Sequence, residues 1–427
     1  MTPTTLQIVG TALFAIAILH TFSVGIFEKL AVRNPANAGM WRLLAEVETV
    51  FGVWAVALTL FIALFSAFQG GSIGGGAQAA VDYLKSLEYK EPMFVFTIMV
   101  MAASRPIIQF SALIVRGVSS LLPVSKPVAV YFTIMSVTPL LSSFITEPAA
   151  MTLAALMLKE QYYSKNISPR LMYATIGTLF VNVSIGGTLT NFAAPPVLMV
   201  AHAWNWDSHF MLTQFGWRSA VAVCFNATIL TLLFHKALGR VDLPAAETSN
   251  KVPAGMMTIH LLLLFVIVCF SHDPPVFVGA FLLFMFVASA YPQHQDRLIL
   301  REGLMVACFL AGLVTLGGQQ GWWLKELFAH MDAASIYYGA TALTAVTDNA
   351  ALTFLGTQVP NLTDEFKYAL VSGAVTGGGL TVIANAPNPA GMSILKGSFK
   401  GGAVNPLWLF LSAAPPTLAA ILAFRLL

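Results

Sequence analysis

Charged residues are scarce: Asp, Glu, Lys and Arg together make up 10% of the 427 residues. Soluble domains carry about 25%, so this chain has too little charge to cover a surface that faces water. Hydrophobic residues make up 57% of the chain instead. Most of this apolar surface must face lipid, which predicts an all-α protein that crosses the membrane many times.

Basic stretches, paired cysteines and nucleotide motifs are also lacking. The 22 basic residues barely exceed the 19 acidic ones, which excludes a nucleic-acid binder. Cys224, Cys269 and Cys308 all lie in apolar runs, so neither a disulfide framework nor a thiolate metal site is expected. The stretch 70–92 lacks the phosphate-loop ending GK[ST], and neither HEXXH nor G-x-S-x-G appears among the predicted spans. We therefore expect no bound nucleotide, no cofactor and no enzyme activity.

Long apolar runs mark the crossings, at about 20 residues each. The first run is too long for the core of a cleavable signal peptide and has no basic segment before it. The Gly-rich stretch 70–92 is predicted to be a flexible connection outside the membrane. Full spans are predicted near residues 5–27, 41–68, 93–115, 216–235, 255–271, 277–291, 302–318 and 405–425.

Four further segments are apolar but interrupted by polar residues, Gly or Pro. Residues 127–160 and 334–359 are each two apolar stretches too short to cross alone, which predicts re-entrant hairpins. Residues 169–202 and 366–395 are long enough to cross but contain Gly, Asn and Pro, which predicts broken helices. Irregular backbone at membrane depth is tolerated only where it packs in protein or lines a wet cavity. The prediction is about 10 spans plus two hairpins, with the function in these four segments.

The basic residues predict the orientation of the chain. With the N-terminus outside, most of them fall in predicted cytoplasmic loops, among them the loop 159–170. This agrees with the excess of Lys and Arg on the cytoplasmic side of membrane proteins. The agreement requires that both hairpins return to the side from which they enter.

An internal repeat is the most specific signal in the chain. Residues 145–156 align with 346–357 without gaps, which pairs Glu147 with Asp348, and GGTLT at 186–190 aligns with GGGLT at 377–381. The two halves begin on opposite sides, so the repeats are inverted, as is typical of secondary transporters. The halves are 1–250 (scaffold spans 5–115, hairpin 127–160, broken helix 169–202, span 216–235) and 251–427 (scaffold spans 255–318, hairpin 334–359, broken helix 366–395, span 405–425).

The hairpin tips carry the two most informative acids, Glu147 and Asp348. A charge at the bilayer centre costs at least about 2.5–3.5 kcal/mol and marks function by default. Carboxylate, amide, hydroxyl and carbonyl oxygens suit a hard monovalent cation. A carboxylate that holds either H+ or Na+, but not both, is a minimal exchanger, and Asp348 is the first choice for it. The candidate ion- and proton-binding residues are Thr146, Glu147, Thr190, Asn191, Thr347, Asp348, Asn349, Thr381, Asn385 and Asn388.

Structural roles are the alternative for each of these residues. Glu147 and Asp348 could simply cap the second helix of each hairpin, and Pro148 suits the start of a helix. The Gly and Pro residues could be kinks or close-packing sites. Arg105, within a predicted span, could be a counter-ion to Glu48 or Glu147, or an anion contact; a structural ion pair is favoured.

The repeated hairpin and broken helix, the Thr347-Asp348-Asn349 motif and the Gly/Asn/Pro breaks resemble the ion transporter superfamily. Within it, the chain is most similar to the sodium/proton antiporters; relatives include arsenite effluxers and sodium-coupled citrate and dicarboxylate transporters. The resemblance implies an ion site between hairpin tips and broken helices, elevator-like movement of that part, and a homodimer held by the remaining spans. It also implies a lipid-embedded protein of the bacterial inner membrane.

The function implied is exchange of Na+, or Li+, for H+ by alternating access. Sodium-coupled symport or efflux of a small anion is the alternative. The tips lack the Ser-Asn-Thr of the dicarboxylate relatives, which argues against an organic anion. The first tip reads Thr146-Glu147-Pro148 rather than acid-Asn, which argues against a second, symmetric cation site. A channel is disfavoured, because gates at two inverted hairpins suit alternating access better than a continuous pore.

Overall fold

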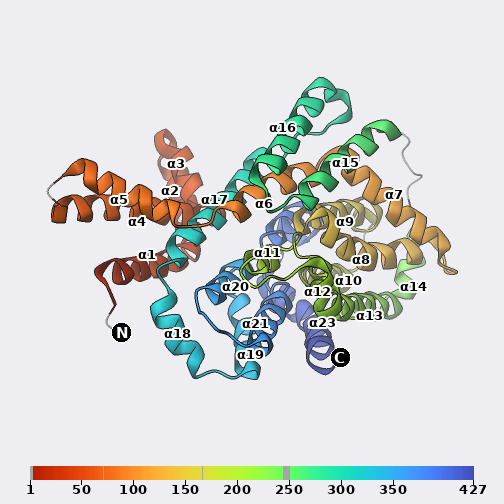
Figure 1. Ribbon diagram of the computed structural model, residues 1–427. Helices are drawn as coiled ribbons and strands as arrows, with labels where there is room; N and C mark the ends of the chain where they lie inside the picture. Colours follow the sequence, from red (N-terminus) through yellow and green to blue (C-terminus); the bar gives the residue numbers. More distant parts are fainter. Residues whose placement is uncertain (1–2, 71, 166, 244–250) are drawn as a thin grey trace. The chain divides into compact units, whose positions relative to one another are not determined.

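The computed structural model describes residues 3–70, 72–165, 167–243 and 251–427, and every regular element in these ranges is a helix (Figure 1). Within these ranges, six helices are long and apolar enough to cross a membrane, or up to eight if each of two bent pairs is one span. These helices confirm an integral, all-helical membrane protein, while the full count of about ten spans stays a prediction. One bent pair is the predicted span 93–115, which is α6 (Lys90–Ala102) and α7 (Arg105–Leu121), bent by 66°.

The chain divides into two compact units. Unit 1 consists of Met1–Phe96, Leu300–Asp332 and Phe354–Leu362, and unit 2 of Thr97–Ile299, Ala333–Thr353 and Thr363–Leu427. Each unit therefore takes segments from both predicted repeats. The α-helices of unit 1 are α1 (Thr5–Thr21), α2 (Val24–Arg33), α3 (Ala38–Leu44), α4 (Val47–Gly70), α5 (Ile73–Lys85), α17 (Leu300–Gly317) and α18 (Gly321–Ala329).

Helix α4 is the centre of unit 1, because α1, α5 and α17 all pack against it. Glycines permit these close approaches: Gly52 faces Cys308, and Gly76 of α5 lies against the carbonyl of Ala63. The prediction of a flexible connection over 70–92 is wrong, since 73–85 forms α5. Gly76 and Ala80 are buried on its inner face, and the small side chains allow a Gly-rich segment to lie on α4 as a helix.

Unit 2 contains the first predicted hairpin, most of the second and both predicted broken helices. Helices α6 and α20 (Asn349–Thr357) run from one unit into the other. The α-helices within unit 2 are α7, α8 (Lys126–Ile145), α9 (Glu147–Gln161), α10 (Pro169–Gly186), α11 (Pro195–Ala201), α12 (Ser208–Met211), α13 (Trp217–Leu233), α14 (His235–Leu238), α15 (Ala254–Cys269), α16 (Pro274–Ala290), α19 (Ala333–Thr344), α21 (Asp364–Gly377), α22 (Asn388–Leu395) and α23 (Pro406–Leu426).

The first hairpin is α8 and α9, which pack against each other (Figure 1). The single residue between them, Thr146, has a φ of 70° and a ψ of 152°, a conformation that is rare for a β-branched residue. Pro148, the second residue of α9, has no backbone N–H. It therefore cannot donate the hydrogen bond that would extend α8 into α9 as one continuous helix. The reversal therefore falls on Thr146-Glu147, as the sequence predicts.

Both predicted broken helices are broken. Helix α10 ends at Gly186 and continues as the 3-10 turn Gly187–Leu189, and α11 begins only at Pro195. Helix α21 ends at Gly377, and α22 begins at Asn388. Helix α10 packs on α8, α13, α21 and α23, and 89% of its candidate span is buried. The break in α10 is therefore enclosed by protein, where irregular backbone is tolerated.

Candidate ion site at the hairpin tips and helix breaks

Glu147 is the first residue of α9 and is fully buried, with 0% of its surface exposed. Its Oε2 accepts a hydrogen bond of 2.8 Å from the Nδ2 of Asn385, in the break between α21 and α22. Its Oε1 and the Oγ1 of Thr146 have no hydrogen-bond partner among the described residues. Gly187 lies beside the carboxylate, since a Cβ there would be 2.6 Å from Oε1. A buried carboxylate thus has one oxygen available between the first tip and both breaks.

Asn349 occupies a similar place at the second tip. It is the first residue of α20 and is fully buried, and its backbone N–H donates to the carbonyl of Ala384, 3.1 Å away. Within the described chain, neither Oδ1 nor Nδ2 of its side chain has a hydrogen-bond partner. A Cβ at Gly378 would be 2.8 Å from Nδ2. This tip therefore offers a neutral amide to the second break.

Two further amides lie in the second break. Asn385 is 1% exposed and Asn388 is fully buried. The Nδ2 of Asn388 donates to the carbonyls of Gly378 and Thr381, at 2.8 Å each, which closes the irregular backbone. The Oδ1 atoms of Asn385 and Asn388 have no partner among the residues that the structure describes.

Partnerless oxygens therefore gather at the tips and breaks. A buried polar atom without a partner costs about 1–3 kcal/mol, and native proteins keep few of them. A group of them suggests a ligand rather than chance. Carboxylate, amide and hydroxyl oxygens are the donors that hard cations prefer. The atoms are Oγ1 of Thr146, Oε1 of Glu147, and Oδ1 of Asn349, Asn385 and Asn388.

Asp348 is half-buried, and its Oδ1 accepts hydrogen bonds from the backbone N–H groups of Ala350 (2.8 Å) and Ala351 (3.3 Å). It therefore makes the contacts of a helix N-cap, which was the structural alternative to an ion-binding role for this residue. Its charge also lies close enough to Glu147 to interact with it. Thr347, also half-buried, donates from its hydroxyl to the carbonyl of Leu343, 3.0 Å away.

The remaining candidates hold the backbone of the breaks. Thr190 donates to the carbonyl of Ser143 (2.6 Å), and Thr381 donates to the carbonyl of Ala345 (2.8 Å). Asn191 donates from Nδ2 to the carbonyl of Trp206 (3.1 Å) and accepts at Oδ1 from Ser208 (2.8 Å). Asn191 thus uses both ends of its amide, one on the loop that follows α11 and the other on the first residue of α12.

Ser143 and Ser184 have roles that the sequence did not reveal. The Oγ of Ser143 donates to the carbonyl of Gly186 (2.7 Å) and accepts from the N–H of Leu189 (2.8 Å), which joins the first hairpin to the first break. Ser184 donates to the carbonyl of Val375 (2.7 Å), where α10 meets α21. A serine in an apolar helix gives no sequence signal for either role, because each depends on a partner helix.

The two halves make three matching contacts, and these define a structural register. In that register Glu147 corresponds to Asn349 and Thr146 to Asp348, and the starts of α9 and α20 agree with it. The sequence alignment paired Glu147 with Asp348, so the contacts differ from it by one residue. The matching contacts are Gly186 against Pro139 and Gly377 against Thr341, Thr190 to Ser143 and Thr381 to Ala345, and Gly187 against Glu147 and Gly378 against Asn349.

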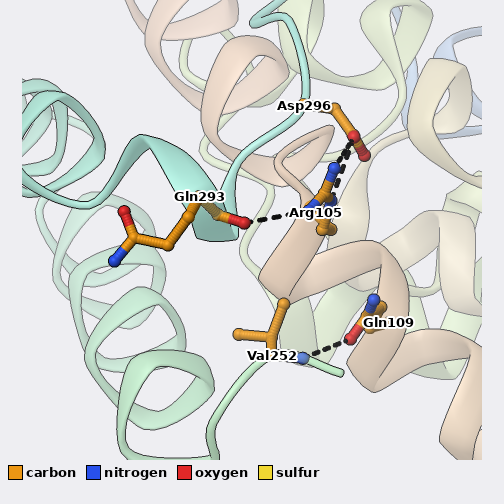
Figure 2. A network of polar contacts seen from close by, with 5 residues as sticks. All are labelled: Arg105, Gln109, Val252, Gln293 and Asp296. Atoms are coloured by element: carbon orange, nitrogen blue, oxygen red, sulfur yellow. Dashed lines mark hydrogen bonds and ion pairs between the residues drawn. The ribbon is translucent and has the colours of Figure 1, made fainter. Parts of the chain in front are cut away.

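Arg105, the first residue of α7, pairs with Asp296 in the loop after α16 (Figure 2). Its Nε donates to Oδ1 of Asp296 at 3.0 Å, and its Nη1 donates to the carbonyl of Gln293 at 3.2 Å. The ion-pair partner is therefore Asp296 instead of Glu48 or Glu147. This is the structural ion pair that was favoured for Arg105, with a different acid.

Comparison with known proteins covers almost the whole chain. The sequence model of one family, described as "Putative Na+/H+ antiporter", matches residues 5–427. A search of curated proteins found no match. The match includes both tips, both breaks and every candidate ligand named above. The chain therefore belongs to this family of Na+/H+ antiporters.

Proposed function

We propose that the protein exchanges Na+, or Li+, for H+ by alternating access, with Glu147 as the carboxylate that holds either ion. The observation that carries the proposal is the fully buried Glu147, held at Oε2 by Asn385, with Oε1 partnerless among the described residues. The partnerless oxygens of Asn349, Asn385 and Asn388 supply neutral ligands. Membership of the antiporter family supports the same chemistry.

Charge balance explains why one carboxylate can couple the two ions. A bare carboxylate is costly to keep at membrane depth. A bound proton and a bound Na+ each cancel its charge, so both loaded forms can be carried through an apolar interior. The unloaded form is the costly one, and it should cross slowly. Exchange of one ion for the other then follows from the cost of moving the empty site.

The contacts of Ser143 suggest which part moves. Its hydrogen bonds to Gly186 and Leu189 tie the first tip to the first break, and Asn385 ties Glu147 to the second break. All the proposed ligands belong to unit 2. We place the elevator-like movement in these segments and assign the scaffold and the homodimer contact to the other spans, in a bacterial inner membrane with the N-terminus outside.

Inverted repeats predict that the hairpins enter from opposite faces. The loop 159–170 is then cytoplasmic and the loop 360–367 is outside. Lys165 and the highly exposed Asp364 are suitable reporters. Single cysteines at these positions, in a background without the native thiols, should be labelled from opposite sides by an impermeant maleimide. Labelling of both from one side would contradict the inverted arrangement.

Transport in inside-out vesicles tests the function directly. With a pH gradient established, added NaCl or LiCl should dissipate it, as read by a pH-sensitive dye, while vesicles without the protein should not respond. Uptake of a labelled small carboxylate in the presence of Na+, without a dye response to Na+ alone, would favour anion symport and refute exchange.

A further inference from the structure

We infer that Asn349 determines the charge of the ion site and thereby restricts it to monovalent cations. The inference rests on the proposed function, since it concerns the same site. It assigns to this asparagine a selectivity role that is distinct from the role of one neutral ligand among several.

The structural register places Asn349 where the first half has Glu147. Each residue is the first of the second helix of its hairpin. Each faces a glycine at the start of a break, Gly187 for Glu147 and Gly378 for Asn349. Both positions also contact the same part of the second break, between α21 and α22. Glu147 accepts from the side chain of Asn385, and the N–H of Asn349 donates to the carbonyl of the preceding residue, Ala384.

Because Asn349 is buried, the neutrality of its side chain affects the net charge of the site. It is 0% exposed, and its amide has no partner at either end within the described ranges. An aspartate has almost the same shape but adds one negative charge. In a site of low dielectric constant such a charge interacts strongly with any cation. The amide therefore keeps the two equivalent tip positions at a single negative charge.

The acid of the second tip lies one position earlier, at Asp348. The Oδ1 of Asp348 accepts backbone N–H groups of α20, and its structural counterpart is Thr146. One carboxylate with neutral oxygens suits Na+ or Li+, whereas Ca2+ sites combine several carboxylate oxygens. A second carboxylate at position 349 should therefore admit Ca2+, which is similar to Na+ in size.

The test measures cation-dependent thermal unfolding of the purified, full-length protein at constant ionic strength. The variants are Asn349→Asp and Asn405→Asp. Asn405 is exposed and caps α23 by accepting from the N–H groups of Leu407 and Trp408, so its substitution adds the same charge away from the site and should cap as well. A double variant, E147Q with N349D, returns the two tip positions to one carboxylate.

Wild type and N405D should be stabilised by Na+ and not by Ca2+. N349D should respond to Ca2+ at a concentration about tenfold or more below any wild-type response, as expected for one added charge in the site, and the double variant should lose that response. An unchanged Ca2+ response in N349D would overturn the inference. So would stabilisation of the wild type by Ca2+ as readily as by Na+, a result that needs no variant to fold. Absence of Na+/H+ exchange by the wild-type protein in vesicles would refute the proposed function, which is a different outcome from failure of the inference about Asn349.

Discussion

The two hairpin tips make equivalent backbone contacts but place their acids differently. In the first tip the acid is Glu147, which begins α9, is fully buried and faces Gly187. In the second tip the acid is Asp348, which precedes α20, is half-buried and caps that helix. The two acids differ by one position in the structural register. Glu147 keeps an oxygen available, whereas Asp348 accepts hydrogen bonds from backbone N–H groups.

Helix capping explains the difference. The residue before a helix can accept its first N–H groups, and Asp348 does so. In the first tip this place belongs to Thr146, whose side chain makes no capping bond, and Pro148 removes one N–H from the first turn. Glu147 is therefore not needed as a cap and can turn toward Asn385. From the sequence alone Asp348 was the first choice for the exchanging carboxylate, whereas these contacts lead us to propose Glu147.

The largest effect is expected for Glu147→Gln. The amide can keep a contact with Asn385 but cannot hold a proton or balance a cation, so exchange should fall to the level of vesicles without the protein. The matched control is Glu46→Gln in unit 1, which removes only a partly exposed ion pair with Arg301 (2.8 Å), worth about 0–1 kcal/mol. Both variants are compared by dye response to Na+ at equal amounts of folded protein. Substantial exchange by E147Q would assign the carboxylate elsewhere.

An intermediate effect is expected for the two glycines that face the tips. In Gly187→Ala the new methyl group would lie 2.6 Å from Oε1 of Glu147, and in Gly378→Ala it would crowd both Ser184 and Asn349. We expect the Na+ concentration for half-maximal exchange to rise by about tenfold in each, equivalent to about 1.4 kcal/mol. Gly117→Ala is the control, because nothing lies within 4 Å of its Cβ. An unchanged Na+ dependence in both variants would show that these two glycines do not affect ion binding.

The smallest effect is expected for Asp348→Asn. Asparagine caps about as well as aspartate, so exchange should continue and the Na+ requirement should change only modestly, through the lost charge near Glu147. Asp348→Ala also removes the cap and should destabilise the protein by about 1 kcal/mol, measured by thermal unfolding. If D348N abolished exchange while E147Q preserved it, the ranking of the two tips would be reversed.

Sequence patterns predicted the segments and many of the residues that form the candidate site. Gly, Asn and Pro interruptions placed both breaks, because they disfavour continuous helix, and the internal repeat identified the two tips. Glu147, Asn349, Asn385 and Asn388 were all among the candidates. These features depend on local chemistry, which a sequence records.

Features that depend on partners in three dimensions were not predicted. The equivalence of Glu147 and Asn349 follows from contacts with Gly187 and Gly378, and an ungapped alignment missed it by one residue. The anchoring of Asn191 to the loop after α11 and the pairing of Arg105 with Asp296 also require the fold. Helix α5 was missed because a Gly-rich segment has low intrinsic helix propensity, and packing against α4 outweighs it.

The pH dependence of the Na+ requirement tests the central claim, that H+ and Na+ compete for one carboxylate, most directly. The measurement is the Na+ concentration for half-maximal exchange in wild-type proteoliposomes, at several values between about pH 6 and pH 9. Because the proton must leave before the cation binds, the account predicts that this concentration rises as the pH falls, approaching about tenfold per unit at the acidic end. A Na+ requirement that is constant across the range would contradict competition at a single site, even if exchange itself were observed.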